Sequence, residues 1–165
     1  MAQVSSTIPD WSREHKSFLS WNPSRSLLAS IRAYQAYGNS SNPLKIFLKK
    51  VAVLRHRFWS VVTGADIPLN CNIGGGLLLP HPNGIVIHPE AIIGPNCLIF
   101  QQVTIGTVTG KNPPLIGGHV DIGAGAKILG EVVVGNHVNI GANAVVLINV
   151  PAGMTAVGVP AKILG

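Results

Sequence analysis

Residues 116–146, IGGHVDIGAGAKILGEVVVGNHVNIGANAVV, place an aliphatic side chain at every sixth position. The same spacing extends back to residue 67, interrupted by two extra residues after Leu79 and by a longer insertion after Ile105. The thirteen positions are Ile67, Ile73, Leu79, Ile87, Ile93, Ile99, Ile105, Ile116, Ile122, Ile128, Val134, Ile140 and Val146. Most are followed four residues later by a small or apolar residue, namely Cys71, Ala91, Cys97, Val103, Val120, Ala126, Val132, Val138, Ala144 and Val150.

A fixed short period indicates units that cannot bury their own apolar faces and must stack on their neighbours. Neither the 3.6-residue period of a helix nor the alternation of a half-buried strand explains a spacing of six. The sequence therefore predicts a β-helix. An ordinary β-sandwich is the alternative, but it would not keep phase over six consecutive repeats. Glycine often follows the aliphatic residue, where a corner requires a positive φ or a close approach of two backbones.

Charge divides the chain of 165 residues into two parts. Residues 1–64 hold nine of the twelve Lys and Arg and two of the six acids, a net charge of +7, whereas residues 65–165 hold three and four, a net charge of −1. With 47% apolar and 11% charged residues the chain can bury a sizeable core. We expect a basic helical N-terminal segment (1–64) and a β-helix domain with a C-terminal tail (65–165).

Two helices are predicted in the basic segment, over residues 25–37 and 43–62, with a turn at residues 38–41. Asn42-Pro43 forms a plausible cap and first-turn pair for the second helix. A basic amphipathic helix can contact an anionic membrane or a nucleic acid, but it is more often a solvated face over a packed one. We favour the solvated face, expect no nucleic-acid partner, and keep peripheral membrane contact as a subsidiary alternative.

The remaining composition predicts a cytoplasmic protein. The first sixteen residues lack an apolar stretch typical of a secretory signal, and no transmembrane segment is evident. Cys71 and Cys97 both occupy the small inward position of their repeats, which indicates packing rather than disulfide or metal chemistry.

Three stretches carry a family resemblance: residues 84–86, GIV; residues 123–130, GAGAKILG; and residues 156–163, AVGVPAKI. They resemble bacterial serine acetyltransferase and the saccharide O-acetyltransferases, which are hexapeptide-repeat acyltransferases. The resemblance covers about residues 65–165. It implies a left-handed parallel β-helix with three hexapeptides per coil, a homotrimer, and acetyl-CoA bound in a groove between subunits.

His81, at the two-residue phase break in LPHPNG, matches the catalytic histidine of that family. Transfer of an acetyl group from a thioester to an alcohol requires removal of the alcohol proton, and neutral imidazole suits that task. Asp66 matches the partner carboxylate, which orients the imidazole. An idle loop histidine and a turn carboxylate are the alternative interpretations.

The resemblance also assigns residues to the co-substrate, acetyl-CoA. Gly106 and Thr107 match positions beside the pantetheine arm, and Ala124 and Ala142 match positions where a small side chain leaves room. Lys162 is a candidate for a CoA phosphate. Small residues are, however, what a narrow coil requires in any case. No metal cofactor is expected.

Two departures from the family concern the acceptor. Pro80 replaces the aspartate that holds the serine amino group, and the loop at residues 110–115 lacks the Arg-His pair used for the amino-acid carboxylate. Unpaired charges in a site are costly. The sequence therefore favours a saccharide or nucleotide-sugar hydroxyl, with Asn83 and Asn112 as acceptor-binding residues, and keeps L-serine as the alternative.

His119 and His137 are 18 residues apart at equivalent repeat positions, so we expect them to stack on one face. Without a third ligand in the pattern, a γ-carbonic-anhydrase-like metal site is only an alternative. A non-catalytic hexapeptide scaffold is the other.

Overall fold

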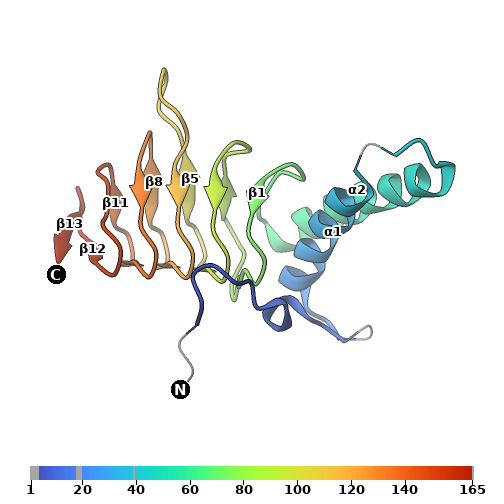
Figure 1. Cartoon of the computed structure of the whole chain (residues 1–165), viewed down its shortest axis with the longest axis horizontal. Helices are drawn as coiled ribbons and strands as arrows, with labels where there is room; N and C mark the ends of the chain where they lie inside the picture. Colours follow the sequence, from blue (N-terminus) through green and yellow to red (C-terminus); the bar gives the residue numbers. More distant parts are fainter. Residues whose placement is uncertain (1–3, 18–19, 39, 165) are drawn as a thin grey trace.

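The computed structural model describes residues 4–17, 20–38 and 40–164, in which two helices precede a long solenoid of short strands (Figure 1). The solenoid is a left-handed parallel β-helix, so the predicted fold class is confirmed. The elements in chain order are η1 (Trp11–Glu14, a 3₁₀ helix), α1 (Pro23–Tyr37), α2 (Pro43–Thr63), β1 (Asn72–Ile73), β2 (Val86–Ile87), β3 (Ile92–Ile93), β4 (Leu98–Ile99), β5 (Thr104–Gly106), β6 (Leu115–Ile116), β7 (Asp121–Ile122), β8 (Lys127–Leu129), β9 (Val133–Val134), β10 (Asn139–Ile140), β11 (Val145–Val146), β12 (Thr155–Val157) and β13 (Lys162–Leu164). The expected domain boundary between residues 64 and 65 stays a prediction.

The strands form three sheets, one on each side of the coil. Their orders are β1-β3-β6-β9, β2-β5-β8-β11 and β4-β7-β10-β12-β13, all parallel except the final pair β12·β13. Ile122 pairs with Ile140, 18 residues later, so three hexapeptides make one coil. The separation grows to 20 between Ile73 and Ile93, across the phase break at residues 80–82, and to 23 between Ile105 and Ile128, across the loop at residues 107–114.

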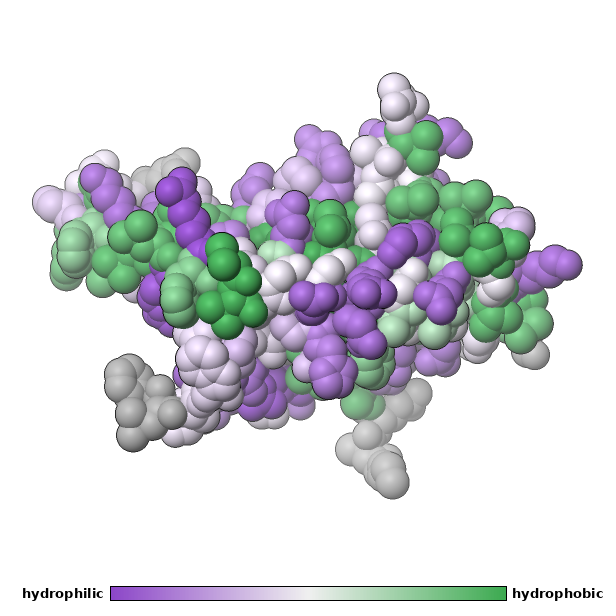
Figure 2. Space-filling view, turned by 180° about the vertical axis from the view of Figure 1, so that it is seen from behind, coloured by the Kyte–Doolittle hydropathy of each residue, from purple (hydrophilic) through white to green (hydrophobic). Residues whose placement is uncertain are grey.

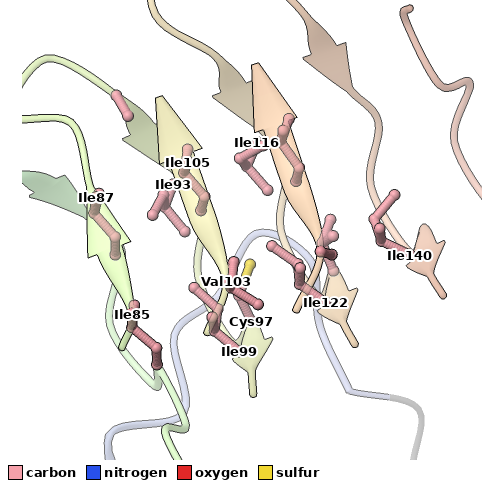
Figure 3. Close-up of a cluster of buried hydrophobic side chains, with 14 of the residues drawn as sticks. Ile85, Ile87, Ile93, Cys97, Ile99, Val103, Ile105, Ile116, Ile122 and Ile140 are labelled. Atoms are coloured by element: carbon pink, nitrogen blue, oxygen red, sulfur yellow. The ribbon is translucent and has the colours of Figure 1, made fainter. Parts of the chain in front are cut away.

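The solenoid interior is filled by the residues that define the six-residue period. All thirteen aliphatic positions are buried, and none is more than 6% exposed. The ten small or apolar residues four positions later are buried as well. Figure 3 shows part of this stack, in which equivalent isoleucines such as Ile87 and Ile105 lie side by side on neighbouring coils. Burial of each such side chain contributes about 1.5–3 kcal/mol, so the periodic residues supply most of the driving force for folding.

Most of the glycines that follow the aliphatic residues are required by close backbone approach, and Gly106 is an exception. Gly94, Gly123 and their equivalents do not have a positive φ. A Cβ on Gly123 would lie 2.6 Å from the backbone nitrogen of Ala142, in the next coil. Of the two reasons considered from sequence, the positive φ is therefore wrong for these positions. Left-handed backbone occurs at other corner residues, including five that are not glycine: Asn96, Gln102, His119, His137 and Asn143.

Both helices begin at an Asn-Pro pair. The Asn22 side chain accepts a hydrogen bond from the backbone N–H of Arg25 at 3.1 Å, so α1 begins at Pro23, two residues before the predicted start. Asn42 caps α2 in the same way, as predicted. The predicted turn at residues 38–41 includes position 39, which lies outside the described residues.

The two helices cover the first coil of the solenoid. Leu27, Leu28 and Ile31 of α1 are buried and belong to the same apolar cluster as the coil interior. The Gln35 side chain donates to the Cys71 carbonyl at 2.9 Å. Repeat arrays need a terminal unit that shields the last apolar face, and α1 performs that task here.

Residues 4–14, which end in η1, run along the outside of the solenoid (Figure 1), and we call this segment the N-terminal strap. Asn96, buried at a corner, donates to the Ser5 carbonyl at 2.7 Å and to the Ile8 carbonyl at 2.8 Å, and accepts from the Asp10 N–H at 2.7 Å. Glu14 accepts from the Gly76 N–H at 2.8 Å. The buried polar side chain of Asn96 is thus satisfied by the strap.

Hydrophobic residues gather toward both ends of the molecule, with hydrophilic residues among them (Figure 2). At the helical end, α2 exposes a set of apolar side chains: Leu44, Ile46, Phe47, Leu54, Phe58 and Val61. Within the described residues, neither helix is both long enough and apolar enough to span a bilayer. Cys71 and Cys97 are free and buried, and burial raises the pKa of the Cys71 thiol to about 12 and that of the Cys97 thiol to about 11.

Candidate active site

His81 lines a pocket of about 680 Å³ between the helices and the first coil. One wall is the segment from Leu77 to Asn83, and the others are residues 21–25 and 28 at the beginning of α1 and residues 62–63 at the end of α2. Pockets of about 300–1,000 Å³ are typical of small-molecule sites. The imidazole is solvent-exposed, so it is available to a ligand that enters the pocket.

Local sequence explains why His81 leaves the regular wall. Pro80 and Pro82 have no N–H to donate to a ladder. The backbone is tied to the next coil on both sides of them, because Leu78 bridges Leu98 and the Gln102 N–H donates to the Asn83 carbonyl at 2.9 Å. The two extra residues therefore form a short excursion between fixed points, and His81 stands in it.

Asp66 begins the first coil and His81 stands near the end of that coil, but Asp66 does not join the pocket lining. The Asp66 backbone forms a parallel bridge with Val86, which pairs the first coil with the second at this point. The Asp66 side chain is exposed, and no hydrogen bond joins it to His81 within the described part of the chain. The fold places these two described residues at the beginning and the end of one coil, with no hydrogen bond between them, so the catalytic pair stays a prediction.

The residues assigned to the co-substrate are distributed along the solenoid, away from the His81 pocket. Gly106 ends β5, and the Thr107 hydroxyl donates to the Lys111 carbonyl at 2.6 Å, which closes the loop at residues 107–114. Ala124 and Ala142 stand at equivalent positions of adjacent coils, 18 residues apart. Lys162 is exposed on β13. These positions come from different sheets and corners of the coil, and none of them lines the His81 pocket.

The two candidate acceptor residues are not brought together. Asn83 lines the His81 pocket and packs over Gly64 at the end of α2. Asn112 is in the loop at residues 107–114, and its side chain donates to Glu131 at 3.0 Å. In one chain, Asn83 is therefore the member of the pair positioned beside His81.

His119 and His137 stack as predicted. Their Nδ1 atoms are 2.8 Å apart and their rings lie 5.0 Å apart at 68°. Both residues have a positive φ, 53° and 59°, which few non-glycine residues adopt. Among the described residues, no group of three or more His, Cys, Asp or Glu is arranged to hold a metal ion.

Sequence reasoning missed the contribution of α1 to the pocket. Trp21, Ser24 and Arg25 line it, together with Leu28. The sequence contains the pair Asn22-Pro23, which places Arg25 in the first turn of α1. It contains no signal for the way in which α1 packs on the coil. Of the described residues that line the pocket, none is acidic, and Arg25 is the one with a permanent charge.

Similar proteins were found by sequence and by structure, although no protein-family model matches the chain. A serine acetyltransferase of Synechocystis is 50% identical over 105 residues, which are 62% of this chain and 42% of that protein. A soybean serine acetyltransferase complexed with serine is 31% identical, with a TM-score of 0.64, over 84% of this chain and 70% of that chain. A Brucella abortus serine acetyltransferase in complex with coenzyme A is 34% identical, with a TM-score of 0.72, over 87% and 56%.

The chain forms a parallel β-helix with a six-residue period and an exposed histidine at its phase break. By its similarity to these proteins, it belongs to the hexapeptide-repeat acyltransferase superfamily. Within that superfamily, the similar proteins reported above are serine acetyltransferases. Their names support the L-serine alternative better than the saccharide acceptor that the sequence departures favoured. The chain spans less than half the length of the curated relatives it matches.

Proposed function

We propose that the protein is an acetyl-CoA-dependent O-acetyltransferase whose general base is His81. The observation that carries the proposal is the position of His81, an exposed imidazole in a pocket of about 680 Å³, in a chain of an acyltransferase superfamily. Pockets that combine a titratable group with apolar walls are the default candidates for active sites.

The chemistry is a direct transfer. The acceptor hydroxyl oxygen attacks the thioester carbonyl while the Nε2 or Nδ1 atom of neutral His81 takes its proton. The carbon–sulfur bond then breaks, and the leaving thiolate recovers that proton, so the imidazole is regenerated. A positioned base of this kind contributes about 10²–10⁴-fold to the rate. We assign Asp66 a positioning role, because a carboxylate stabilises the imidazolium, and catalytic hydrogen bonds often tighten only when substrate is bound.

Acetyl-CoA is the proposed co-substrate, supported by similar serine acetyltransferases with bound coenzyme A. Gly106 and Thr107 would flank the pantetheine arm, Ala124 and Ala142 would leave it room, and Lys162 would meet a phosphate. Since none of these positions lines the His81 pocket in one chain, a neighbouring subunit would bring the two parts of the site together. We therefore include self-association as a homotrimer in the proposal.

L-serine is the acceptor we propose first, on the names of the similar proteins. A saccharide hydroxyl is the second candidate, favoured by Pro80 in the position of an amino-group ligand and by the absence of the Arg-His pair from the loop at residues 110–115. Both acceptors present a hydroxyl to the same base.

The test is CoA release from acetyl-CoA with L-serine and, separately, with sugars and nucleotide sugars. We expect turnover with one of these acceptors and at least a 100-fold loss in His81→Ala. His88→Ala is the matched control, because that half-buried ring accepts only a local N–H, from Glu90 at 3.2 Å, and lies outside the pocket. Full activity of His81→Ala would refute the assignment of the base. Absence of turnover together with absence of acetyl-CoA binding in calorimetry would indicate the scaffold alternative.

A further inference from the structure

The pocket beside His81 contains a cation that the proposed reaction does not use. We propose that Arg25 binds an anionic group of the acceptor, a carboxylate or a phosphate, and so selects hydroxyl acceptors that carry a negative charge. This inference rests on the proposed function, because it names the substrate class of the same site.

The hydrogen bonding of Arg25 leaves its guanidinium available. One donor, on Nη1, reaches the His15 carbonyl at 2.6 Å. A guanidinium has five N–H donors, arranged as a planar fork that matches carboxylate and phosphate oxygens. The bond to His15 holds one end of that fork in place and leaves the other donors for a ligand.

A comparison within α1 shows what Arg25 lacks. Arg32, two turns later, forms an ion pair with Glu14 at 2.8 Å, and this is the salt bridge found among the described residues. Arg25 is also partly buried but has no carboxylate partner there, and no described residue that lines its pocket is acidic. Partial burial of an unpaired charge is unfavourable, and an anionic ligand would relieve it.

Arg25 is held in place by the helix that carries it, as a specificity residue requires. Its backbone N–H is capped by Asn22 at 3.1 Å, and the adjacent residues Leu27 and Leu28 are buried against the first coil. The guanidinium is therefore carried by a packed helix rather than by a mobile loop. Binding residues held in this way are pre-organised and lose little entropy when the ligand arrives.

The charge of the pocket restricts the acceptor. A hydroxy acid or a sugar phosphate presents an anion for Arg25 and a hydroxyl for His81, whereas a neutral polyol presents only the hydroxyl. L-serine meets the requirement through its carboxylate. Its ammonium group has no carboxylate partner among the described residues of the pocket, so an analogue without the ammonium should bind at least as well.

The experiment measures equilibrium binding without acetyl-CoA, because Trp21 lines the pocket and its fluorescence reports a ligand there. The probes are 3-hydroxypropionate, glycerol 3-phosphate and neutral 1,3-propanediol. We expect the native protein to bind one of the two anions at least tenfold more tightly than the diol. The anion that binds more tightly shows whether the site prefers a carboxylate or a phosphate.

Three variants complete the test. Arg25→Gln should remove the preference for the anion, Arg25→Lys should keep part of it, and the control Arg55→Gln, an exposed cation on α2 outside the pocket, should keep all of it. Circular dichroism checks that each variant is folded. If Arg25→Gln is misfolded, the test rests on Arg25→Lys and on the binding of the three probes to the native protein. An anion preference that is absent in the native protein, or unchanged in Arg25→Gln, would overturn the inference.

The two proposals can fail separately. Anion binding that depends on Arg25, without CoA release from any acceptor, would refute the acetyltransferase proposal and leave this inference standing. Turnover that depends on His81, with equal binding of anionic and neutral probes, would do the opposite.

Discussion

The ion pair between Arg32 and Glu14 joins α1 to both the N-terminal strap and the first coil, and its removal should be costly. Arg32 donates to Glu14 through Nη2 at 2.8 Å and through Nε at 3.1 Å. It also donates to the carbonyls of Ile73 at 2.6 Å and Gly74 at 2.7 Å. The side chains are 20% and 9% exposed. Arg32→Ala therefore leaves a nearly buried carboxylate without its cation and two carbonyls without their donor.

Breaking a buried pair by removing one partner costs about 3–5 kcal/mol. Because Arg32 retains some exposure, we expect the lower end, about 3 kcal/mol. For a chain of this size, each kcal/mol corresponds to about 2–4 °C in Tm, so the expected decrease is roughly 6–12 °C.

The measurement is urea unfolding followed by circular dichroism, at one fixed protein concentration because self-association adds to apparent stability. Arg55→Ala, an exposed cation on α2, is the control and should change the free energy of unfolding by less than about 0.5 kcal/mol. A loss below about 1 kcal/mol in Arg32→Ala would show that the pair contributes no more than a surface salt bridge.

Three other predictions concern the solenoid. Gly123→Ala should destabilise the protein by about 1–3 kcal/mol, since its Cβ would lie 2.6 Å from the Ala142 nitrogen, whereas Gly106→Ala, with its nearest contact at 3.6 Å, should be tolerated. Urea titrations of the two variants compare their stabilities, and equal values would contradict the close-approach explanation. Ile122→Ala should cost about 2–5 kcal/mol in the same assay, because that side chain is fully buried, and a loss under 1 kcal/mol would count against a packed core. Burial raises the pKa of the Cys97 thiol from 9.0 to about 11, so this thiol ionises at a lower pH in the unfolded chain, and stability should fall as the pH rises from 9 to 11. Unfolding measured across this pH range checks the decrease, and labelling of the native thiol at pH 8 should be slow, so that rapid labelling would contradict the prediction.

The repeat made the solenoid predictable because six-residue spacing is a property of the chain itself. Each periodic side chain contacts its counterpart one coil away, so position in the sequence determines position in the stack. The register offsets of 18 residues, and the larger ones at the phase break and the loop, were therefore contained in the spacing. The stacking of His119 on His137 followed from the same arithmetic.

The site was less predictable, because it depends on contacts between parts of the chain that share no period. His81 was found from the phase break and the family resemblance. The pocket around it required α1 to pack on the first coil, and no repeat encodes that packing. Arg25 consequently remained a helix residue without a role until the structure placed it in the lining of the His81 pocket. The reason for the repeated glycines could not be decided from the sequence either, since both close backbone approach and a positive φ select glycine.

The N-terminal strap changes how the first half of the solenoid should open. In a simple repeat array each unit contacts only its neighbours, so the ends fray one unit at a time. Here one continuous segment binds Gly76 through Glu14, Asn96 through Asp10, and packs Ser6 against Gly118, residues of three successive coils. The strap thereby links the first of these coils to the third, which is not its neighbour in the stack. Amide hydrogens of these three coils should exchange with solvent in a single concerted opening, while the coils beyond Gly118 retain the graded fraying of an unlinked array.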